Sequence, residues 1–277
     1  MTPWSEAVEH KSDPISLMGW VRVLIRATIL IVLVFGSLLL LLFVRLFEWP
    51  VFGLHRPVTP HITQFVCRNA LRILRIPLNV TGEPLQGQAA VVANHTSWLD
   101  IFVLNASKRI YFVSKAEVAG WPGIGWLARA TGTLFIKRER GQAQAQTKIM
   151  QARLLVGHKL LFFPEGTSTD GQQVLPFKTT LFASFMAPEL RETLQVQPVS
   201  VVYHAPEGAP KHFYGWWGDM EFATNLIGTL AAPRQGSIDV IYHPALKVAD
   251  FADRKSLARA AETAVRTGHT QLLGNGC

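Results

Sequence analysis

Residues 89–100 read AAVVANHTSWLD, and this stretch decides the fold expected for the whole chain. The five apolar residues 89–93 are typical of a strand buried on both faces, as in a parallel sheet covered by helices. Polar residues 94–97 follow at once, and residues 98–105 have a helical pattern. A strand, a polar turn and a helix in this order indicate an α/β unit, in which ligand-facing side chains collect at the carboxyl ends of strands.

The same alternation of short apolar runs and helical periods continues downstream. Further buried strands are expected at residues 109–113, 132–136, 159–163, 196–203 and 237–243. Further helices are expected at residues 123–130, 143–156 and 177–187, with a last one from Asp253 to Arg266 that Gly268 ends. Strands separated by helices favour parallel pairing, so the sequence predicts an α/β fold with a largely parallel sheet flanked by helices.

An uncharged apolar run, ATILIVLVFGSLLLLLFV, occupies residues 27–44. It is long enough to enter or cross a membrane, and too long for the core of a signal peptide. We therefore expect a retained N-terminal membrane-embedded helical segment rather than a cleaved leader or a buried soluble helix. Pro50 and Gly53 are expected to break the helix beyond it. Whether the segment spans the bilayer or re-enters it as a hairpin stays open.

Two parts of the chain are expected to meet near the prolines at 57 and 60. Residues 1–60 form the predicted membrane-anchoring segment, and residues 61–277 form the predicted catalytic domain. Residues 62–75 read as a basic amphipathic helix, ITQFVCRNALRILR. Such a helix can lie in the headgroup layer or cover the surface of the main domain, and the pattern does not decide between these positions.

Composition excludes several classes of protein. With 49% apolar residues, the chain of 277 residues is not disordered over most of its length. Its 27 Lys and Arg against 19 Asp and Glu give a net charge of +8, which in so apolar a chain fits membrane headgroups better than nucleic acid. Two cysteines exclude a disulfide scaffold and a cysteine-rich metal site. No G-x-S-x-G, H-E-x-x-H or P-loop sequence is present, which argues against a serine hydrolase, a zinc protease and an NTPase.

His95 and Asp100 are the first candidates for catalysis. Five residues apart on one continuous helix, their side chains would point in different directions, but a turn between them lets the carboxylate fold back to the imidazole. A carboxylate that accepts from one ring nitrogen raises the basicity of the other. The pair would then act as a general base towards an alcohol. The alternative is an aspartate that caps a helix and a histidine with a structural role.

Two further groups of residues follow predicted strands and are candidates for binding. Glu165, Gly166 and Thr167 offer a carboxylate, a flexible backbone and a hydroxyl, although these residue types also make ordinary turns. Arg138 lies in the basic run KRER, and Lys115 follows the strand at 109–113. Cations at strand ends could hold an anion, or they could belong to a solvated loop.

Four motifs in a fixed order carry a family resemblance. They are H-x4-D at residues 95–100, GTLFIKR at 132–138, FPEGT at 163–167 and the V-x-P-V strand at 196–199. Their order resembles that of the lysophospholipid acyltransferase family, which includes the 1-acylglycerol-3-phosphate acyltransferases. The resemblance covers residues 78–203, with an apolar segment upstream in the expected place.

This resemblance implies a membrane-bound O-acyltransferase of lipid biosynthesis. It would move a fatty acyl group from acyl carrier protein or CoA, as co-substrate, to the hydroxyl of a lysolipid, with no other cofactor, no metal and no nucleic acid. His95 would be the base and Asp100 its orienting partner. Arg138 and residues 165–167 would hold the polar head of the acceptor, with Lys115 as a further anion contact. Thioester donors place the catalytic domain on the cytosolic face of the inner membrane.

Ser168 departs from the family pattern, which often has an arginine after the threonine. The variant resembles the lyso-ornithine-lipid branch of the family, whose acceptor has no phosphate. The acceptor therefore stays open between the lysophosphatidate of 1-acylglycerol-3-phosphate acyltransferases and lyso-ornithine lipid. A non-catalytic membrane lipid-binding protein is the alternative from another class. Chain length, donor carrier and oligomeric state also stay open.

Overall fold

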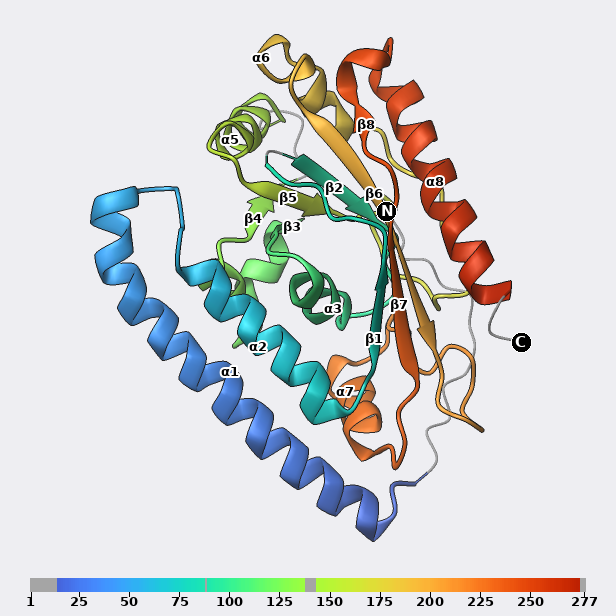
Figure 1. The fold of residues 1–277 in the computed structure, drawn as a ribbon. Coiled ribbons are helices and arrows are strands. Elements are labelled where there is room, and N and C mark those ends of the chain that lie inside the picture. Colours follow the sequence, from blue (N-terminus) through green and yellow to red (C-terminus); the bar gives the residue numbers. More distant parts are fainter. Residues whose placement is uncertain (1–13, 88, 138–142, 275–277) are drawn as a thin grey trace.

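The computed structural model describes residues 14–87, 89–137 and 143–274 (Figure 1). Its α-helices are α1 Leu17–Phe52, α2 Thr59–Leu74, α3 Asp100–Ser107, α4 Ile124–Ala130, α5 Ala143–Leu155, α6 Pro188–Arg191, α7 Phe222–Ala231 and α8 Arg254–Gly274. Its strands are β1 Leu78–Thr81, β2 Ala89–Ala93, β3 Tyr111–Lys115, β4 Leu134–Ile136, β5 Lys159–Phe162, β6 Gln195–His204, β7 Ser237–Tyr242 and β8 Leu246–Lys247. Short 3-10 helices cover Ala116–Gly120, Leu181–Met186 and Val248–Asp250.

Within the described residues, the strands form one sheet in the order β1-β7-β6-β2-β5-β3-β4, with β8 beside β6. All pairs in this path are parallel except β6 with β7. The predicted α/β fold with a largely parallel sheet is confirmed. β2 lies in the middle of the sheet, between β6 and β5. The end of β2 is therefore surrounded by the ends of other strands.

Both faces of the sheet are covered by helices, as the apolar run at 89–93 predicted. Val91 and Ala93 belong to a core shared with α2 and α3, and Ala90 and Val92 belong to a core shared with α5 and α8. All four side chains are buried. Since consecutive side chains of a strand point to opposite faces, the unbroken apolar run supplies both cores at once.

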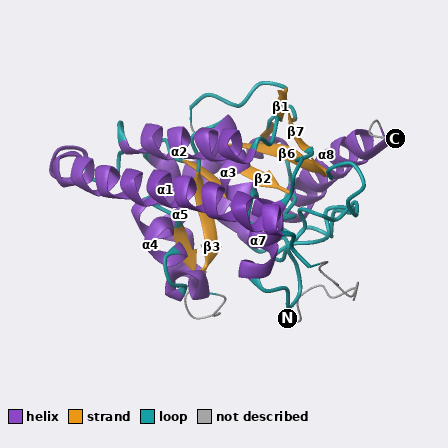
Figure 2. Cartoon of the chain, turned by 90° about the horizontal axis from the view of Figure 1, so that it is seen from below, coloured by secondary structure: helices purple, strands orange, loops and turns teal. Residues whose placement is uncertain are grey.

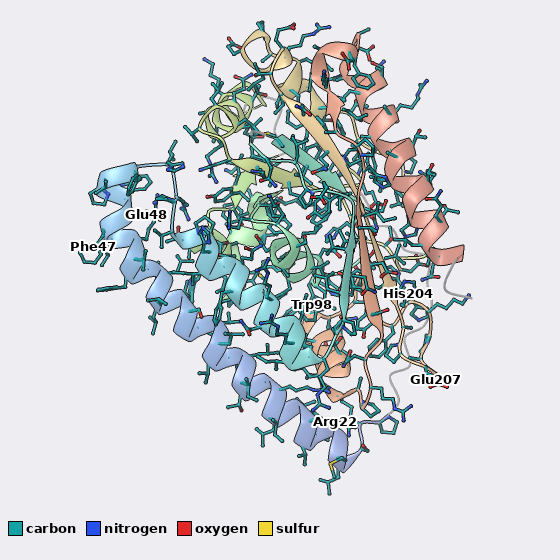
Figure 3. The ribbon with its side chains drawn as sticks, viewed as in Figure 1. Arg22, Phe47, Glu48, Trp98, His204 and Glu207 are labelled. Atoms are coloured by element: carbon teal, nitrogen blue, oxygen red, sulfur yellow. The ribbon has the colours of Figure 1, made fainter. Side chains whose placement is uncertain are left out.

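α1 lies along the outside of α2 and carries most of its large apolar side chains in exposed positions, Phe47 among them (Figures 1 and 3). At 36 residues it is long and apolar enough to cross a membrane. Its N-terminal half, however, is tied to α7, because Arg22 donates to the Ala231 carbonyl at 2.7 Å and Arg26 donates to the Leu230 carbonyl at 2.8 Å. Figure 2 shows α1 running beside α2, with α7 near one end.

The other end of α1 is tied to α2. The buried carboxylate of Glu48 accepts from the backbone N–H groups of Val58 and Thr59 at 2.7 and 3.1 Å, and from the Thr59 hydroxyl at 2.7 Å. Arg45 donates to the same carboxylate at 3.1 Å. Glu48 therefore caps the start of α2 from a distance in sequence. Arg22 and Glu48 mark the two ends of α1 in Figure 3.

The expectation that Pro50 breaks the helix was wrong. α1 continues through Pro50 to Phe52, and Gly53 ends it with a φ of 56°. A proline in the last turn removes one N–H group, and the Gly53 N–H still closes the turn onto the Trp49 carbonyl at 2.9 Å. The predicted boundary at residue 60 falls in the first turn of α2, and the division into a membrane-anchoring segment and a catalytic domain stays a prediction.

The helix predicted at residues 62–75 is α2, and it covers the main domain. Cys67, Leu71 and Leu74 are buried in the core that includes α3. Arg68 donates to the carbonyl of Ala106, at the end of α3, at 2.9 Å. The basic face of the helix is thus partly used for contacts inside the protein.

Other differences from the predicted elements have local causes. Of the helix predicted at 177–187, the structure has only the 3-10 helix Leu181–Met186. The N–H groups of Phe177 and Lys178, before it, bond to Glu262 and to the Pro164 carbonyl. α8 continues through Gly268 to Gly274. The glycine at position 268 is there for space, since an added Cβ would lie 2.5 Å from His243 Cε1. β1, β8 and α7 were not predicted.

Candidate active site

Asn94 ends β2 and places His95 outside the sheet. Its side-chain amide donates to the Val201 carbonyl at 2.8 Å, and its side-chain oxygen accepts from the Val201 N–H at 2.8 Å. These bonds replace the backbone ladder between β2 and β6, whose register ends at Ala93 and Val199. The chain therefore turns away at the carboxyl end of a central strand, where α/β sheets bind ligands.

His95 and Asp100 are in direct contact, as the turn between them led us to expect. Asp100 is the first residue of α3, and its Oδ2 lies 2.6 Å from His95 Nδ1. The same oxygen accepts from the N–H groups of Thr96 and Ser97 at 2.9 and 3.1 Å. One carboxylate thus caps the turn into α3 and holds the imidazole, so the two roles considered as alternatives occur together.

The contact leaves one ring nitrogen of His95 for chemistry. Nδ1–H donating to the carboxylate places the lone pair on Nε2, which can take a proton from a hydroxyl. The His95 side chain is 22% exposed and that of Asp100 is fully buried. The ring of Phe163 stacks on the imidazole with centroids 4.0 Å apart and planes 10° apart, which restricts its rotation. A ligand can reach the imidazole, and water does not reach the carboxylate behind it.

Glu165 is in contact with the backbone of His95 and is buried, with 1% exposure. Its Oε1 accepts from the His95 N–H at 2.6 Å and its Oε2 from the Leu175 N–H at 2.7 Å. Burial raises the pKa of Glu165 to about 8, the two backbone bonds oppose this, and the charge of Asp100 adds to it. We expected the carboxylate to hold the acceptor, but both of its oxygens bond to the backbone that carries His95 and the loop after it.

Two loops hold the His95 backbone from the other sides. The Thr169 N–H donates to the His95 carbonyl at 3.0 Å, and the Trp216 N–H donates to the Thr96 carbonyl at 2.9 Å. Gly171 lies so close to Thr96 that a Cβ added to the glycine would be 2.6 Å from Thr96 Cγ2. The φ of Gly171 is +79°. A glycine is required there by both space and backbone conformation.

The other predicted binding residues surround this site at the same edge of the sheet or lie outside the described residues. Gly166, with a φ of +75°, and Thr167 follow Glu165 in one turn, and Thr167 is half-buried. Lys115 is exposed at the end of β3, which runs parallel to β5 and β2. Arg138 lies outside the described residues. The structure therefore brings together His95, Asp100 and Glu165, and the binding roles of the other residues stay predictions.

Two residues that touch the site carried no assignment in the sequence. Phe163 was part of the FPEGT motif, and its ring proves to orient the imidazole. Tyr203 donates to Asp100 Oδ1 at 2.5 Å from the far end of β6. Nothing in the strand pattern at 196–203 distinguishes this hydroxyl from one that packs in a core. Among residues 14–87, 89–137 and 143–274, no cluster of three His, Cys, Asp or Glu side chains could hold a metal ion.

A histidine held by a buried carboxylate at a strand end of an α/β sheet is the arrangement that the predicted general base requires. Comparison with known proteins identifies the family of enzymes to which the chain belongs. Residues 77–228 match the family described as acyltransferase, and the chain belongs to this family. The matched residues contain the whole site described above.

Individual relatives agree with this assignment. The chain is 55% identical over 258 residues to a lyso-ornithine lipid O-acyltransferase of Rhodobacter capsulatus, which covers 93% of this chain and 94% of that protein. It is 37% identical over 121 residues to a 1-acyl-sn-glycerol-3-phosphate acyltransferase of Neisseria gonorrhoeae, covering 42% of this chain and 47% of that protein. The crystal structure of a 1-acyl-sn-glycerophosphate acyltransferase of Thermotoga maritima shares the fold, with a TM-score of 0.63 and 20% identity over 92% of this chain and 95% of that chain.

The contacts of Glu165 generate a prediction about catalysis. We expect Glu165→Gln to lower kcat by about tenfold, because a glutamine has one acceptor oxygen, cannot hold both the His95 and the Leu175 N–H groups, and so lets the His95 backbone shift. KM for the lysolipid should stay within about twofold, since a group that acts through His95 does not alter ground-state binding. Steady-state kinetics with a varied lysolipid concentration measure both constants.

Thr167→Val is the matched control, because Thr167 lies in the same turn and its hydroxyl bonds only to the Ser168 carbonyl, at 3.4 Å, among the contacts recorded for it. If Thr167 holds the acceptor, this variant raises KM and leaves kcat nearly unchanged. A raised KM with an unchanged kcat in Glu165→Gln would instead return the carboxylate to the acceptor contact that the sequence suggested.

Proposed function

We propose that the protein is a lyso-ornithine lipid O-acyltransferase that uses an acyl thioester as donor. The observation that carries this proposal is the 55% identity to the Rhodobacter capsulatus protein of that name, which extends over 93% of this chain and so includes α1 as well as the catalytic domain. Membership of the acyltransferase family and the arrangement of His95 and Asp100 support the reaction class.

The dyad accounts for the chemistry as follows. Nε2 of His95 takes the proton from the acceptor hydroxyl while the hydroxyl oxygen attacks the thioester carbonyl carbon. Asp100 stabilises the imidazolium that forms. The carbon–sulfur bond then breaks, an ester is left on the acceptor, and the leaving thiolate takes the proton from Nε2. His95 returns to its starting state, so no acyl-enzyme and no cysteine are needed.

Ser168 supports an acceptor without phosphate. A phosphate is best held by a guanidinium, which makes two parallel charge-assisted hydrogen bonds, whereas a serine hydroxyl makes one neutral bond. Ser168 is nearly buried, at 9% exposure, so the larger arginine would need space that the side chains around it now fill. Lysophosphatidate remains the second candidate, favoured by the Neisseria gonorrhoeae relative, although that similarity covers only 42% of this chain.

The dyad also argues against a lipid-binding protein without catalysis. Burying the charge of Asp100 is costly, and a neutral asparagine could still accept from the backbone N–H groups that cap the turn. The carboxylate is instead kept 2.6 Å from an imidazole that a ligand can reach. This cost is explained when the imidazole has to accept a proton.

We place the protein on the cytosolic side of the inner membrane, with α1 lying in the plane of one leaflet. Thioester donors are found in the cytosol. The 36 residues of α1 extend over about 54 Å, whereas the hydrocarbon core is about 30 Å thick. Arg22 ties one end of α1 to α7, and Glu48 ties the other to α2. With both ends held on one domain, an in-plane helix that exposes its apolar face to lipid fits better than a spanning one.

His95→Ala is expected to lower acyl transfer at least about a hundredfold, since a general base contributes that much or more. Expression, thermal unfolding and membrane association should stay as in the unmutated protein. The assay follows labelled acyl chains from acyl carrier protein to lyso-ornithine lipid. His204→Ala is the matched control, because His204 also pairs with an aspartate, Asp239, at 2.7 Å, but outside the site. Near-normal turnover by His95→Ala would exclude the mechanism.

The acceptor is tested by competition. With equal concentrations of lyso-ornithine lipid and lysophosphatidate in mixed micelles, we expect kcat/KM to favour lyso-ornithine lipid at least about tenfold, because a missing guanidinium contact to phosphate is worth that much or more. A preference for lysophosphatidate by the unmutated enzyme would assign the second candidate, and turnover of neither acceptor with any thioester would favour a binding protein.

The orientation of α1 is tested by thiol labelling. Ser16→Cys and His55→Cys each place a thiol at an exposed position beside one end of α1, in a chain that also carries Cys277→Ser. We expect a membrane-impermeant maleimide to label both thiols in inverted vesicles and neither in spheroplasts. Arg234→Cys, at an exposed position of the catalytic domain, reports which face is accessible. Labelling of the two ends from opposite sides would mean that α1 spans the membrane.

A further inference from the structure

Asp100 has a second oxygen that His95 does not touch. Oδ1 accepts a hydrogen bond from the Tyr203 hydroxyl at 2.5 Å, across 103 residues of chain. Asp100 is 0% exposed and Tyr203 is 5% exposed, so water does not compete for this bond. Oδ2 already accepts from the imidazole and from two backbone N–H groups. Among the described residues, the hydrogen-bond donor to Oδ1 is Tyr203.

Tyr203 is a donor that keeps its proton. Burial, and next the charge of Asp100, raise the pKa of the Tyr203 phenol well above its ordinary value. The hydroxyl therefore stays neutral at any pH at which the enzyme works. Its bond to an anionic oxygen belongs to the strong class of charge-assisted hydrogen bonds, and it withdraws negative charge from the carboxylate.

The fold holds this phenol in a fixed place. Tyr203 belongs to β6, where it faces Ile238 of the antiparallel strand β7. Its ring packs against the ring of Tyr214 at 5.6 Å between centroids. The Tyr203 hydroxyl donates to Asp100 and the ring is buried, so Tyr203 cannot touch a lipid substrate. Any effect on the reaction must pass through Asp100.

We propose that Tyr203 is a positioning residue of the acyl transfer, one that holds Asp100 Oδ1 and sets how strongly the carboxylate retains a proton on His95. This inference rests on the proposed role of His95 as the base. With Oδ1 bonded to Tyr203, the Asp100 carboxylate cannot rotate, and its Oδ2 stays directed at His95 Nδ1. By sharing the negative charge, the phenol also weakens the attraction between the carboxylate and the imidazolium.

Loss of the Tyr203 hydroxyl should change the pH dependence of kcat/KM in one direction. Without the hydroxyl, the carboxylate carries more charge on the side of His95 and stabilises the imidazolium more strongly. A protonated His95 cannot act as the base. The acidic limb of kcat/KM should therefore move to higher pH. Above that limb kcat should still be lower, because a carboxylate held only at Oδ2 orients the imidazole less well than one held at both oxygens.

Other ionisable groups near the dyad are accounted for. Glu165, whose pKa is raised to about 8 by burial, bonds to the His95 backbone, and Arg266 acts on Glu165 electrostatically. Tyr214 has its pKa raised to about 12 by burial and stays neutral. Loss of the Tyr203 hydroxyl changes none of the contacts that these groups make.

The experiment compares Tyr203→Phe with Tyr214→Phe in the full-length protein. Tyr214 is the matched control, because its buried hydroxyl donates to Gln235 at 2.7 Å, accepts from Gly236 at 2.9 Å and does not touch Asp100. We expect Tyr203→Phe to move the acidic limb up by about half a unit to one unit and to lower kcat roughly tenfold, the size of one charge-assisted bond. Both KM values should stay within about twofold.

Tyr214→Phe should lower the melting temperature without moving the acidic limb. An acidic limb and a kcat in Tyr203→Phe equal to those of the unmutated enzyme, or of Tyr214→Phe, would overturn the inference. If Tyr203→Phe is too slow to assay, an NMR titration of the His95 ring in detergent micelles, assigned with His95→Asn, gives the same answer without turnover. Activity of His95→Ala would instead refute the proposed base, so the two failures are distinguishable.

Discussion

Asp100 carries a charge in a place that water does not reach, and the arrangement of the site follows from this. A buried carboxylate is stable only where hydrogen-bond donors replace its hydration. Here the donors come from the turn after β2, from His95 and from β6. The three can meet only if β2 stops at residue 93, α3 begins at residue 100 and β6 lies next to β2. The central strands and the dyad are therefore parts of one arrangement.

The apolar helix α1 is subject to a related constraint. Arginines among apolar side chains need acceptors, because an unpaired charge in apolar surroundings is costly. Arg22 and Arg26 find them in the carbonyls at the end of α7, where a helix presents its negative pole. α7 also carries Asn225, which accepts from Trp98 in the turn between His95 and Asp100 at 2.8 Å. A chain of direct contacts thus connects the apolar surface of α1 to the catalytic turn, which suits an enzyme whose substrates are lipids.

Prediction from the sequence succeeded where one physical pattern dominates. The buried strands were placed within two residues, because apolar runs between turn residues leave few alternatives. It failed where a long-range contact overrides the local signal. Gly268 reads as a helix stop, but α8 continues through it and the glycine gives room for His243. β1 was missed because its four residues, LNVT, are too few to establish a period and are largely exposed.

The sequence by itself determined the α/β fold, the apolar helix, the acyltransferase motifs and the contact between His95 and Asp100, because each depends on residues that are near in the chain or on a pattern with a fixed period. Only the tertiary structure decided that both oxygens of Glu165 accept from backbone N–H groups, that Tyr203 bonds to the far side of Asp100, and that both ends of α1 are tied to one domain. Each of these depends on which groups remain to satisfy a buried charge or a helix end once distant segments have packed. A hydrogen bond across 70 or 103 residues leaves no periodic trace in the sequence that could announce it.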